Sequence, residues 1–397
     1  MNTVCSVLTP PGRGAVAVVV VAGPQATAAV DQFFHAKNRR PLVEQPIARI
    51  VYGSWASSGE DLVICRRAAE HIEIHCHGGS QAVATITSDL CQASCMEISW
   101  QEWLGRQGED ALETEARIAL AQAASARTAA ILLDQFHGAL KRELTAIREL
   151  LPLDLATARQ RLDALLSTAE FGSHLARPWQ VVIAGKPNVG KSSLINALVG
   201  YQRAIVFDQP GTTRDVVTAS TVIDGWPVTL SDTAGLHAAT DKLETAGIEL
   251  TRERLALADL VVWVLDTSQI EPNALASRDG IINVESGIPE ASACGSALTL
   301  PAKQLLVLNK IDRVNEWAGS AGLIATSATM GVGIDELLAA ISAALVPEVP
   351  PRGAAVLFAE WQQVGLADAL AMCRQGNPSG AVEILSNLVN HARCGES

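Results

Sequence analysis

A glycine-bounded loop with the composition of a phosphate site lies at residues 185–193, which read GKPNVGKSS. An apolar, strand-like run precedes this loop, and a helix-like run, SLINALVG, follows it. In such a loop the glycines let successive backbone N–H groups point at one centre, at the positive end of the next helix. The ammonium of Lys191 then reaches the β- and γ-phosphates, and the hydroxyl of Ser192 ligates Mg²⁺; the alternative is an ordinary glycine-rich turn. The expected phosphate-binding residues are Asn188, Val189, Gly190, Lys191, Ser192 and Ser193.

Two downstream motifs carry groups suited to the third phosphate and the metal. Thr212 and Thr213, in GTTRD, are expected to lie over the γ-phosphate, with Thr213 as a second Mg²⁺ ligand. The Asp-Gly pair at 224–225 separates two strand-like runs and predicts a hairpin. That hairpin would deliver Asp232, in DTAG, toward the metal. Gly235 would offer its backbone N–H to the γ-phosphate, because only glycine permits so close an approach.

Two further apolar runs, VVWVLD at 261–266 and LLVLNKID at 305–312, read as buried parallel strands. A carboxylate at the position of Asp312 can accept both the N1–H and the exocyclic amino group of guanine, and adenine lacks that pair of donors. Residues 327–328 follow another short apolar run and are expected to form the last loop that contacts the base. The order of these motifs predicts binding of GTP. The expected base-contacting residues are Asn309, Lys310, Asp312, Ser327 and Ala328.

The composition restricts the class of protein. The chain has 397 residues and a net charge of −12, so any contact with nucleic acid must use a local basic patch. Its eight cysteines include no CxxC pair, which argues against a disulfide framework or a structural zinc site. The chain opens without a basic segment, and no apolar run approaches the roughly 20 residues that span a bilayer. We therefore expect a soluble cytoplasmic protein without membrane contact.

Three different residue patterns follow one another along the chain, and together they predict a multidomain α/β protein. Residues 1–105 mix short β-like runs with Gly/Pro turns, which predicts an N-terminal α+β domain. Residues 106–176 and 350–397 carry apolar residues at three- and four-residue spacing, as amphipathic helices require. Residues 177–349 alternate strands with helices, the rhythm of a mostly parallel sheet. We therefore expect a P-loop GTPase domain inserted into a helical domain that is made from both flanks.

The motifs together resemble a known family. The stretches GKPNVGKSSLINAL, AIVFDQPGTTRD, DTAGLHAATDKLETAGIE and NKID look like the tRNA modification GTPases called MnmE or TrmE. The N-terminal TPPGRGAVAVVVVAG and EIHCHGGSQAV look like the opening domain of that family. The resemblance implies GTP hydrolysis that gates the addition of an aminomethyl or carboxymethylaminomethyl group at C5 of the tRNA wobble uridine. It also implies a homodimer and an FAD-dependent partner protein, MnmG.

The resemblance further implies hydrolysis without an arginine finger. In this family a K⁺ ion, bound when two GTPase domains meet across the nucleotide, stabilises the developing charge. Its side-chain ligand would be Asn188, and carbonyl oxygens near residues 202–210 would complete the site. Glu244 matches the family's glutamate that orients the attacking water through a second water. Without the resemblance, Glu244 would read as a solvated carboxylate on a helix face.

The outer parts of the chain depart from the family pattern. In the family the first domain binds 5-formyl-tetrahydrofolate, and Arg13 and Glu73 are the matching residues here. The family's segment with the pattern PGEF-T-RAF-NGK-DL-QAEA is rewritten as SWQEWLGRQGEDALETEA, which removes part of the expected folate pocket. The family tail contains a cysteine tied to the modification chemistry. Here Cys394 stands fourth from the end, but the lysine of that tail is absent.

Two alternative functions of the whole chain stay open. A reduced family member would keep GTP hydrolysis and act as a switch or an RNA or ribosome assembly factor, which the rewritten segment favours. A nucleotide-binding scaffold without turnover is disfavoured by Asn188, Thr213, Asp232 and Glu244. A local alternative concerns HIEIHCHGG at 71–79, where strand alternation would place three histidines on one face, as in a transition-metal site. Positions two apart on a strand are about 7 Å apart, however, which is too far for one ion without a bend.

Overall fold

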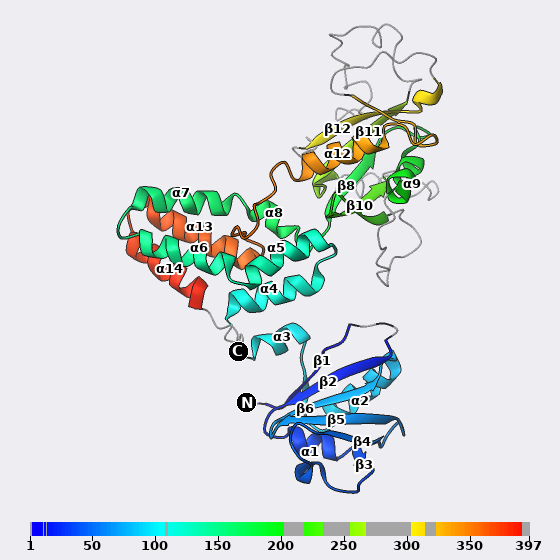
Figure 1. Cartoon of the computed structure of the whole chain (residues 1–397), viewed down its shortest axis with the longest axis vertical. Coiled ribbons are helices and arrows are strands. Elements are labelled where there is room, and N and C mark those ends of the chain that lie inside the picture. Colours follow the sequence, from blue (N-terminus) through cyan, green and yellow to red (C-terminus); the bar gives the residue numbers. More distant parts are fainter. Residues whose placement is uncertain are drawn as a thin grey trace, which may run out of the picture. The chain divides into compact units, whose positions relative to one another are not determined.

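The computed structural model describes residues 2–10, 12, 14–107, 110–201, 218–232, 255–266, 303–313 and 323–390. These residues form two compact units, one that extends to Thr114 and one over Glu115–Val389 (Figure 1). Within the described ranges, no helix combines the length and the apolar character that a membrane crossing requires.

The first unit is built on one seven-stranded sheet with the order β3-β4-β5-β6-β2-β1-β7. Neighbouring strands are antiparallel except β1 and β7, which are parallel. Mixed strands and helices of this kind are what the sequence predicts for an α+β domain. The bounds are β1 Val4–Val7, β2 Val16–Ala22, α1 Ala26–Asp31, β3 Phe34–Ala36, β4 Ile50–Trp55, β5 Asp61–Ala68, β6 His71–His77, α2 Ser80–Gln92, β7 Met96–Glu97 and α3 Trp100–Gly105.

Strand β6 shows why this sheet forms. Its side chains alternate between a buried set, Ile72, Ile74 and Cys76, and a set that is half-buried or exposed. Because successive side chains of a strand point to opposite faces, one face of β6 packs into the core of the unit. That core also takes in residues of β2 and of helices α1 and α2.

The helical part of the second unit is made from segments on both sides of the nucleotide motifs. Gln135 of α5 bridges them, because its Nε2 donates to Ala354 O at 2.9 Å and its Oε1 accepts from Val356 N at 3.2 Å. The helices before and after the insertion therefore belong to one body, as the sequence predicts. The bounds are α4 Ala111–Gln122, α5 Ala126–Phe136, α6 Ala139–Leu150, α7 Leu155–Leu166, α8 Ala169–Ser173, α13 Glu360–Arg374 and α14 Pro378–Asn390.

The inserted domain contains a six-stranded sheet with the order β13-β12-β11-β8-β10-β9. All neighbours are parallel except β9 and β10, which form an antiparallel hairpin. The hairpin turns at Asp224 and Gly225, so the prediction from that pair is confirmed. The bounds are β8 Trp179–Ala184, α9 Lys191–Tyr201, β9 Thr218–Ile223, β10 Trp226–Asp232, β11 Leu260–Asp266, β12 Gln304–Asn309, β13 Ile324–Ala325 and α12 Ile334–Leu345.

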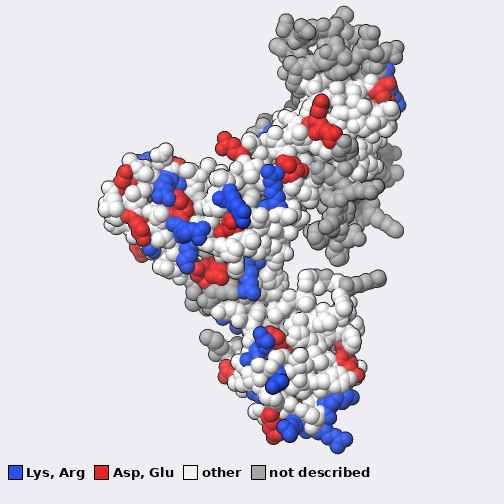
Figure 2. All heavy atoms as spheres, viewed as in Figure 1, with Lys and Arg blue, Asp and Glu red and all other residues white. Residues whose placement is uncertain are grey.

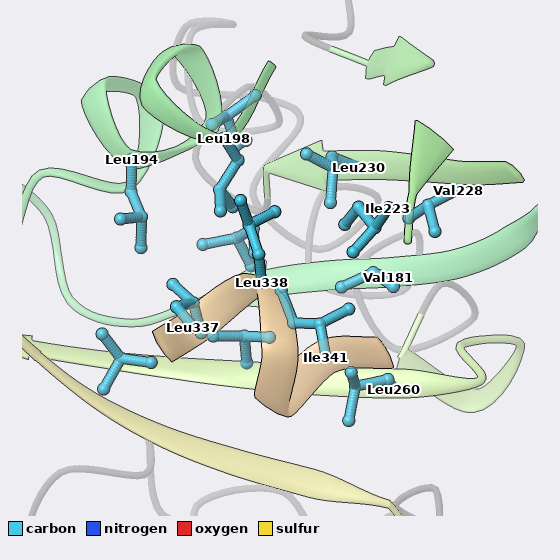
Figure 3. Packing of buried hydrophobic residues seen from close by; sticks show 14 of the residues in the cluster. Val181, Leu194, Leu198, Ile223, Val228, Leu230, Leu260, Leu337, Leu338 and Ile341 are labelled. Atoms are coloured by element: carbon cyan, nitrogen blue, oxygen red, sulfur yellow. The ribbon is translucent and has the colours of Figure 1, made fainter. Parts of the chain in front are cut away.

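Helices α9 and α12 cover this sheet with apolar side chains. Figure 3 shows Leu194 and Leu198 of α9, together with Leu337 and Ile341 of α12, directed toward the buried residues of the strands. The central strands are buried along nearly their whole length, for example Leu260–Leu265 in β11. Parallel strands covered on both faces have continuous apolar sequences, which explains why these runs do not alternate.

Candidate nucleotide-binding site

The loop between β8 and α9 has the backbone of a phosphate cradle. Asn188 and Gly190 have φ angles of +66° and +95°. A Cβ at Gly185 would lie 2.3 Å from Val264 O, and one at Gly190 would lie 2.4 Å from Asn309 Nδ2. Both positions therefore require glycine for steric reasons, and the loop leads directly into the N-terminus of α9.

Lys191 begins α9, and its side chain folds back over the loop. Its Nζ donates to Gly185 O and to Lys186 O, both at 3.0 Å, and the residue is 5% exposed. Burial lowers the pKa of the Lys191 ammonium, and the carboxylate of Asp232 opposes that shift in part. A cation that is held by carbonyl dipoles in a desolvated cradle is suited to pair with phosphate oxygens.

Ser192 and Asp232 meet beside this lysine. The Ser192 hydroxyl, in the first turn of α9, donates to Asp232 Oδ2 at 2.7 Å. Asp232 is the last residue of β10 and is only 2% exposed. A hydroxyl and a carboxylate are the hard oxygen ligands that Mg²⁺ combines with substrate phosphates. These two side chains fit the metal that the sequence predicts.

Asn309 connects the phosphate loop to the loop that follows β13. Its Nδ2 donates to Val189 O at 3.0 Å. Its Oδ1 accepts from Ala328 N at 3.2 Å and from Thr326 Oγ1 at 3.3 Å. With 1% exposure, the Asn309 side chain is a buried cross-link between three segments.

Lys310 and Asp312 lie at the same end of β12. Lys310 Nζ donates to Asn188 O and forms an ion pair with Asp266 Oδ2 at 3.3 Å. Ser327 Oγ donates to Asp312 Oδ1 at 2.5 Å, which orients that carboxylate. The expected base-contacting residues are thus brought together at the carboxyl ends of the parallel strands, where open α/β sheets bind ligands.

Asp266 belongs to no motif that predicted a functional role. This residue ends β11, and its carboxylate pairs with the ammonium of Lys310, which directly follows β12. The sequence signal for Asp266 was its position at the end of a buried apolar run, like that of Asn309 at the end of β12.

Several predicted residues lie outside the described part of the chain. They are Thr212, Thr213, Gly235, Glu244, Arg13, Cys394 and the loop at 202–210. The remaining predicted residue of the first unit, Glu73, forms an ion pair with Arg67 at 3.4 Å, and its Oε2 lies 3.5 Å from His75 Nε2. Among the described residues there is no group of three or more His, Cys, Asp or Glu side chains that could hold a metal ion.

The two sequence motifs of the first unit do come together. Gly78 N donates to Ala15 O at 3.2 Å. A Cβ at Gly78 would lie 2.2 Å from Gly14 O, so the backbone approach requires glycine. The end of the TPPGRG stretch therefore contacts the HCHGG stretch.

Comparison with known proteins gives two matches to family models. Residues 3–109 match the model described as "GTP-binding protein TrmE N-terminus", and residues 180–292 match "50S ribosome-binding GTPase". Among curated proteins, the chain is 31% identical over 422 residues to the tRNA modification GTPase MnmE of Prochlorococcus marinus strain MIT 9313, covering 94% of this chain and 88% of the relative. It is 31% identical over 392 residues to the protein of that name from Geobacillus thermodenitrificans, covering 86% and 81%.

Solved structures also resemble part of the chain. The crystal structure of Aquifex aeolicus Era bound to GDP and aluminium fluoride matches 43% of this chain and 58% of its own, with 28% identity and a TM-score of 0.29. The G domain of the T. maritima iron transporter FeoB matches 42% of this chain and 97% of its own, with 25% identity and a TM-score of 0.26.

Proposed function

Because the chain belongs to the MnmE family of tRNA modification GTPases, we propose that it hydrolyses GTP with K⁺ as an activator and thereby gates modification of the tRNA wobble uridine. The observation that supports this most directly is the hydrogen bond of 2.7 Å between Ser192 and Asp232. It brings together the two oxygen ligands that a Mg²⁺-bound triphosphate requires, next to the ammonium of Lys191.

Each side chain of the site has a separate part in this proposal. The loop from Asn188 to Ser193 binds the phosphates through its backbone N–H groups, and Lys191 neutralises the β- and γ-phosphates. Ser192 and Asp232 hold Mg²⁺, which would withdraw negative charge from the phosphate oxygens when bound. Asp312, oriented by Ser327, accepts the two donors of guanine. Thr212, Thr213 and Gly235 complete the contacts to the γ-phosphate.

The proposed K⁺ site depends on Asn188. This residue lies at an exposed bend of the loop with a φ of +66°, so its side-chain oxygen is accessible to an ion beside the phosphates. A second copy of the GTPase domain would close the site, which makes the active species a homodimer. Glu244 would orient the attacking water.

The direct experiment is steady-state GTP turnover in KCl and in NaCl across a range of protein concentrations. The proposal requires turnover per monomer that rises with protein concentration in KCl and stays low in NaCl. Equal turnover in the two salts at every concentration would exclude the K⁺ site and the dimer together.

The tRNA reaction is proposed to need an MnmG-like FAD protein that acts with this chain in the cytoplasm. The net charge is −12, and the face in Figure 2 has Lys and Arg interspersed with Asp and Glu, so contact with tRNA would use local basic clusters. Deletion of the gene, followed by nucleoside mass spectrometry of total tRNA, tests this part. Loss of the C5 group from wobble uridine supports it, and unchanged modification excludes it.

A second function is favoured by one local observation. The rewritten segment in place of the family's folate segment begins with a short helix, α3, which Ser99 and Glu102 cap reciprocally. A reduced family member that hydrolyses GTP as a switch or an RNA or ribosome assembly factor would need neither folate nor Cys394. Binding of 5-formyl-tetrahydrofolate by the purified protein, involving Arg13 and Glu73, would favour the modification function, and its absence would favour the switch.

A further inference from the structure

The turn between β9 and β10 is bound by the start of helix α5. Asp224 and Gly225 have φ angles of +47° and +80°, as both central residues of a type I′ turn do. Arg127 Nη1 donates to Asp224 O at 2.5 Å and to Asp224 Oδ2 at 2.9 Å. Ser125 Oγ donates to Gly225 O at 2.5 Å. Two side chains of the helical part thus hold one hairpin turn of the GTPase domain.

The fit around this turn is close. A Cβ at Gly225 would lie 2.8 Å from Arg127 Cδ, so the stem of the arginine packs directly on the turn. The guanidinium carbon of Arg127 lies 4.5 Å from the centroid of the Trp226 ring. Phe171 of α8 meets the same ring edge-on, with centroids 5.5 Å apart. Any shift of the turn must therefore change contacts with the helices.

Ser125 links the turn to the stability of α5 itself. It is the N-cap of the helix, and its Oγ accepts from Thr128 N at 3.1 Å while it donates to Gly225 O. A hydroxyl that makes both bonds is held in one orientation. Loss of the bond to Gly225 would free the hydroxyl and weaken the cap, which raises fraying of the first turn of α5.

The other end of β10 reaches the metal-binding residues. The strand runs from Trp226, next to the turn, to Asp232, which accepts the hydrogen bond from Ser192. It pairs with β8 from Val228 to Asp232 and with β9 from Trp226 to Ser231. A strand of this length spans about 20 Å and is rigid because both edges are bonded. One rigid element therefore joins the carboxylate at the Mg²⁺ position to the turn held by α5.

We propose that strand β10 transmits the state of the bound nucleotide from Asp232 to helix α5 through Arg127 and Ser125. This inference rests on the proposed GTP cycle, because the change begins at the ligands that Asp232 shares with Ser192. Transmission requires that the contact of the turn with α5 differ in free energy between the GDP and GTP states. Through this strand, a GTP cycle would change the contacts of the helical part of the protein.

A second contact between the same two parts offers a matched control. Glu170 of α8 forms an ion pair with Lys303 at 2.8 Å, and Lys303 directly precedes β12. This pair lies at the end of β12 opposite to Asn309, away from the nucleotide residues. Glu170→Gln removes an ion pair between the two parts and leaves the turn untouched.

The test compares amide hydrogen exchange of α5 in the full chain with GDP and with a non-hydrolysable GTP analogue, in NaCl and Mg²⁺. In the wild type, we expect exchange in residues 126–130 to differ at least about threefold between the two nucleotides. Arg127→Gln, which keeps the stem of the side chain, should abolish the difference, and Glu170→Gln should retain it. Equal exchange in the wild type, or a difference that survives in Arg127→Gln, would overturn the proposal.

Nucleotide affinity gives a reciprocal readout, because coupling between two sites acts in both directions. Arg127→Gln and Asp224→Asn should each change the ratio of the Kd for GDP to the Kd for the analogue by about fivefold. The asparagine tolerates the positive φ of the turn, so the hairpin is preserved. The double variant should show no further change, and Glu170→Gln no change. Unaltered ratios in both single variants would contradict the proposal.

These measurements separate the inference from the proposed function. Both are made in NaCl with a nucleotide that is not hydrolysed, so they do not depend on K⁺, on dimerisation or on tRNA. If the exchange difference is absent while KCl stimulates turnover, the inference is wrong and the proposed function stands. If the difference is present and KCl has no effect, the inference holds and the K⁺ mechanism is wrong.

Discussion

The hydroxyl of Ser192 and the carboxylate of Asp232 lie 2.7 Å apart, although 40 positions separate them in the sequence. The contact joins the first turn of α9 to the last residue of β10. Two residues that belong to separate motifs are thereby brought together, and the proposed Mg²⁺ site can be tested at this pair.

Removal of the Ser192 hydroxyl should weaken binding of GTP mainly when Mg²⁺ is present. We expect Ser192→Ala to raise the Kd for GTP at least about tenfold in Mg²⁺, the size of one lost charge-assisted bond. With EDTA the wild type and the variant should bind alike. Ser220→Ala, at an exposed position of β9, is the control, and titration with a fluorescent GTP analogue gives the values. An equal loss of affinity in both conditions would contradict the assignment of a metal ligand.

Asp312→Asn should change which base is bound. The amide presents one donor and one acceptor where guanine needs two acceptors, so the Kd for GTP should rise by roughly 10²-fold. Xanthosine triphosphate, which carries an oxygen in place of the amino group, should then be preferred. Competition between the two nucleotides measures this preference, and unchanged GTP affinity would refute the role of Asp312.

Asn188→Ala tests the proposed K⁺ ligand. The variant should bind GTP with nearly unchanged affinity, because the backbone N–H groups of the loop remain. Its turnover in KCl should fall to the level measured in NaCl. Asn196→Ala, on α9 beyond the loop, provides the control. Full K⁺ stimulation in Asn188→Ala would place the ion elsewhere.

Glu244→Ala tests the proposed water-positioning residue. If this carboxylate acts in proton transfer or in orienting the attacking water, turnover should fall roughly 10²- to 10⁴-fold with little change in nucleotide affinity. Single-turnover measurements of GTP hydrolysis separate the chemical step from product release. Near-normal turnover would return Glu244 to the role of a solvated carboxylate on a helix face.

The cysteines of the first unit should differ sharply in reactivity. Burial, followed by the neighbouring Cys91, Cys95 and Glu97, raises the pKa of the Cys5 thiol to about 12. Burial also raises the pKa values of Cys76 and Cys95 to about 11. At pH 8 the thiolate, which is the reactive form, is therefore only about 10⁻³ to 10⁻⁴ of each of these three.

Iodoacetamide at pH 8 should accordingly modify Cys91, which is exposed, before the buried Cys5, Cys76 and Cys95. Peptide mass spectrometry measures the order, and labelling in denaturant should remove it. Modification of Cys5 at the rate of Cys91 in the folded protein would contradict the burial that the structure shows.

Much of the fold could be predicted from local patterns. The hairpin at Asp224 and Gly225 follows from a turn type that needs two positive φ angles. The buried strands β11 and β12 appear as continuous apolar runs because parallel strands are covered on both faces. The phosphate loop could be predicted from its glycines. In the structure, neither of these positions has room for a Cβ atom.

The contacts between distant segments could not be predicted in this way. The pair of Lys310 with Asp266 joins residues 44 positions apart, and the contact of Arg127 with Asp224 joins residues 97 positions apart. Neither leaves a periodic or local signature, because register and packing between elements decide which charges meet. The phosphate-loop motif also did not predict the hydrogen bonds of Lys191 itself. Its ammonium donates to carbonyl groups of its own loop.

Asn309 has a consequence for how guanosine nucleotides are held. Its amide side chain hydrogen-bonds both the phosphate loop and the loop that follows β13, so a movement of one loop disturbs the other. The binding free energies of the base and of the triphosphate should therefore not be additive. Guanosine alone, which carries no phosphate, should already rigidify the phosphate loop.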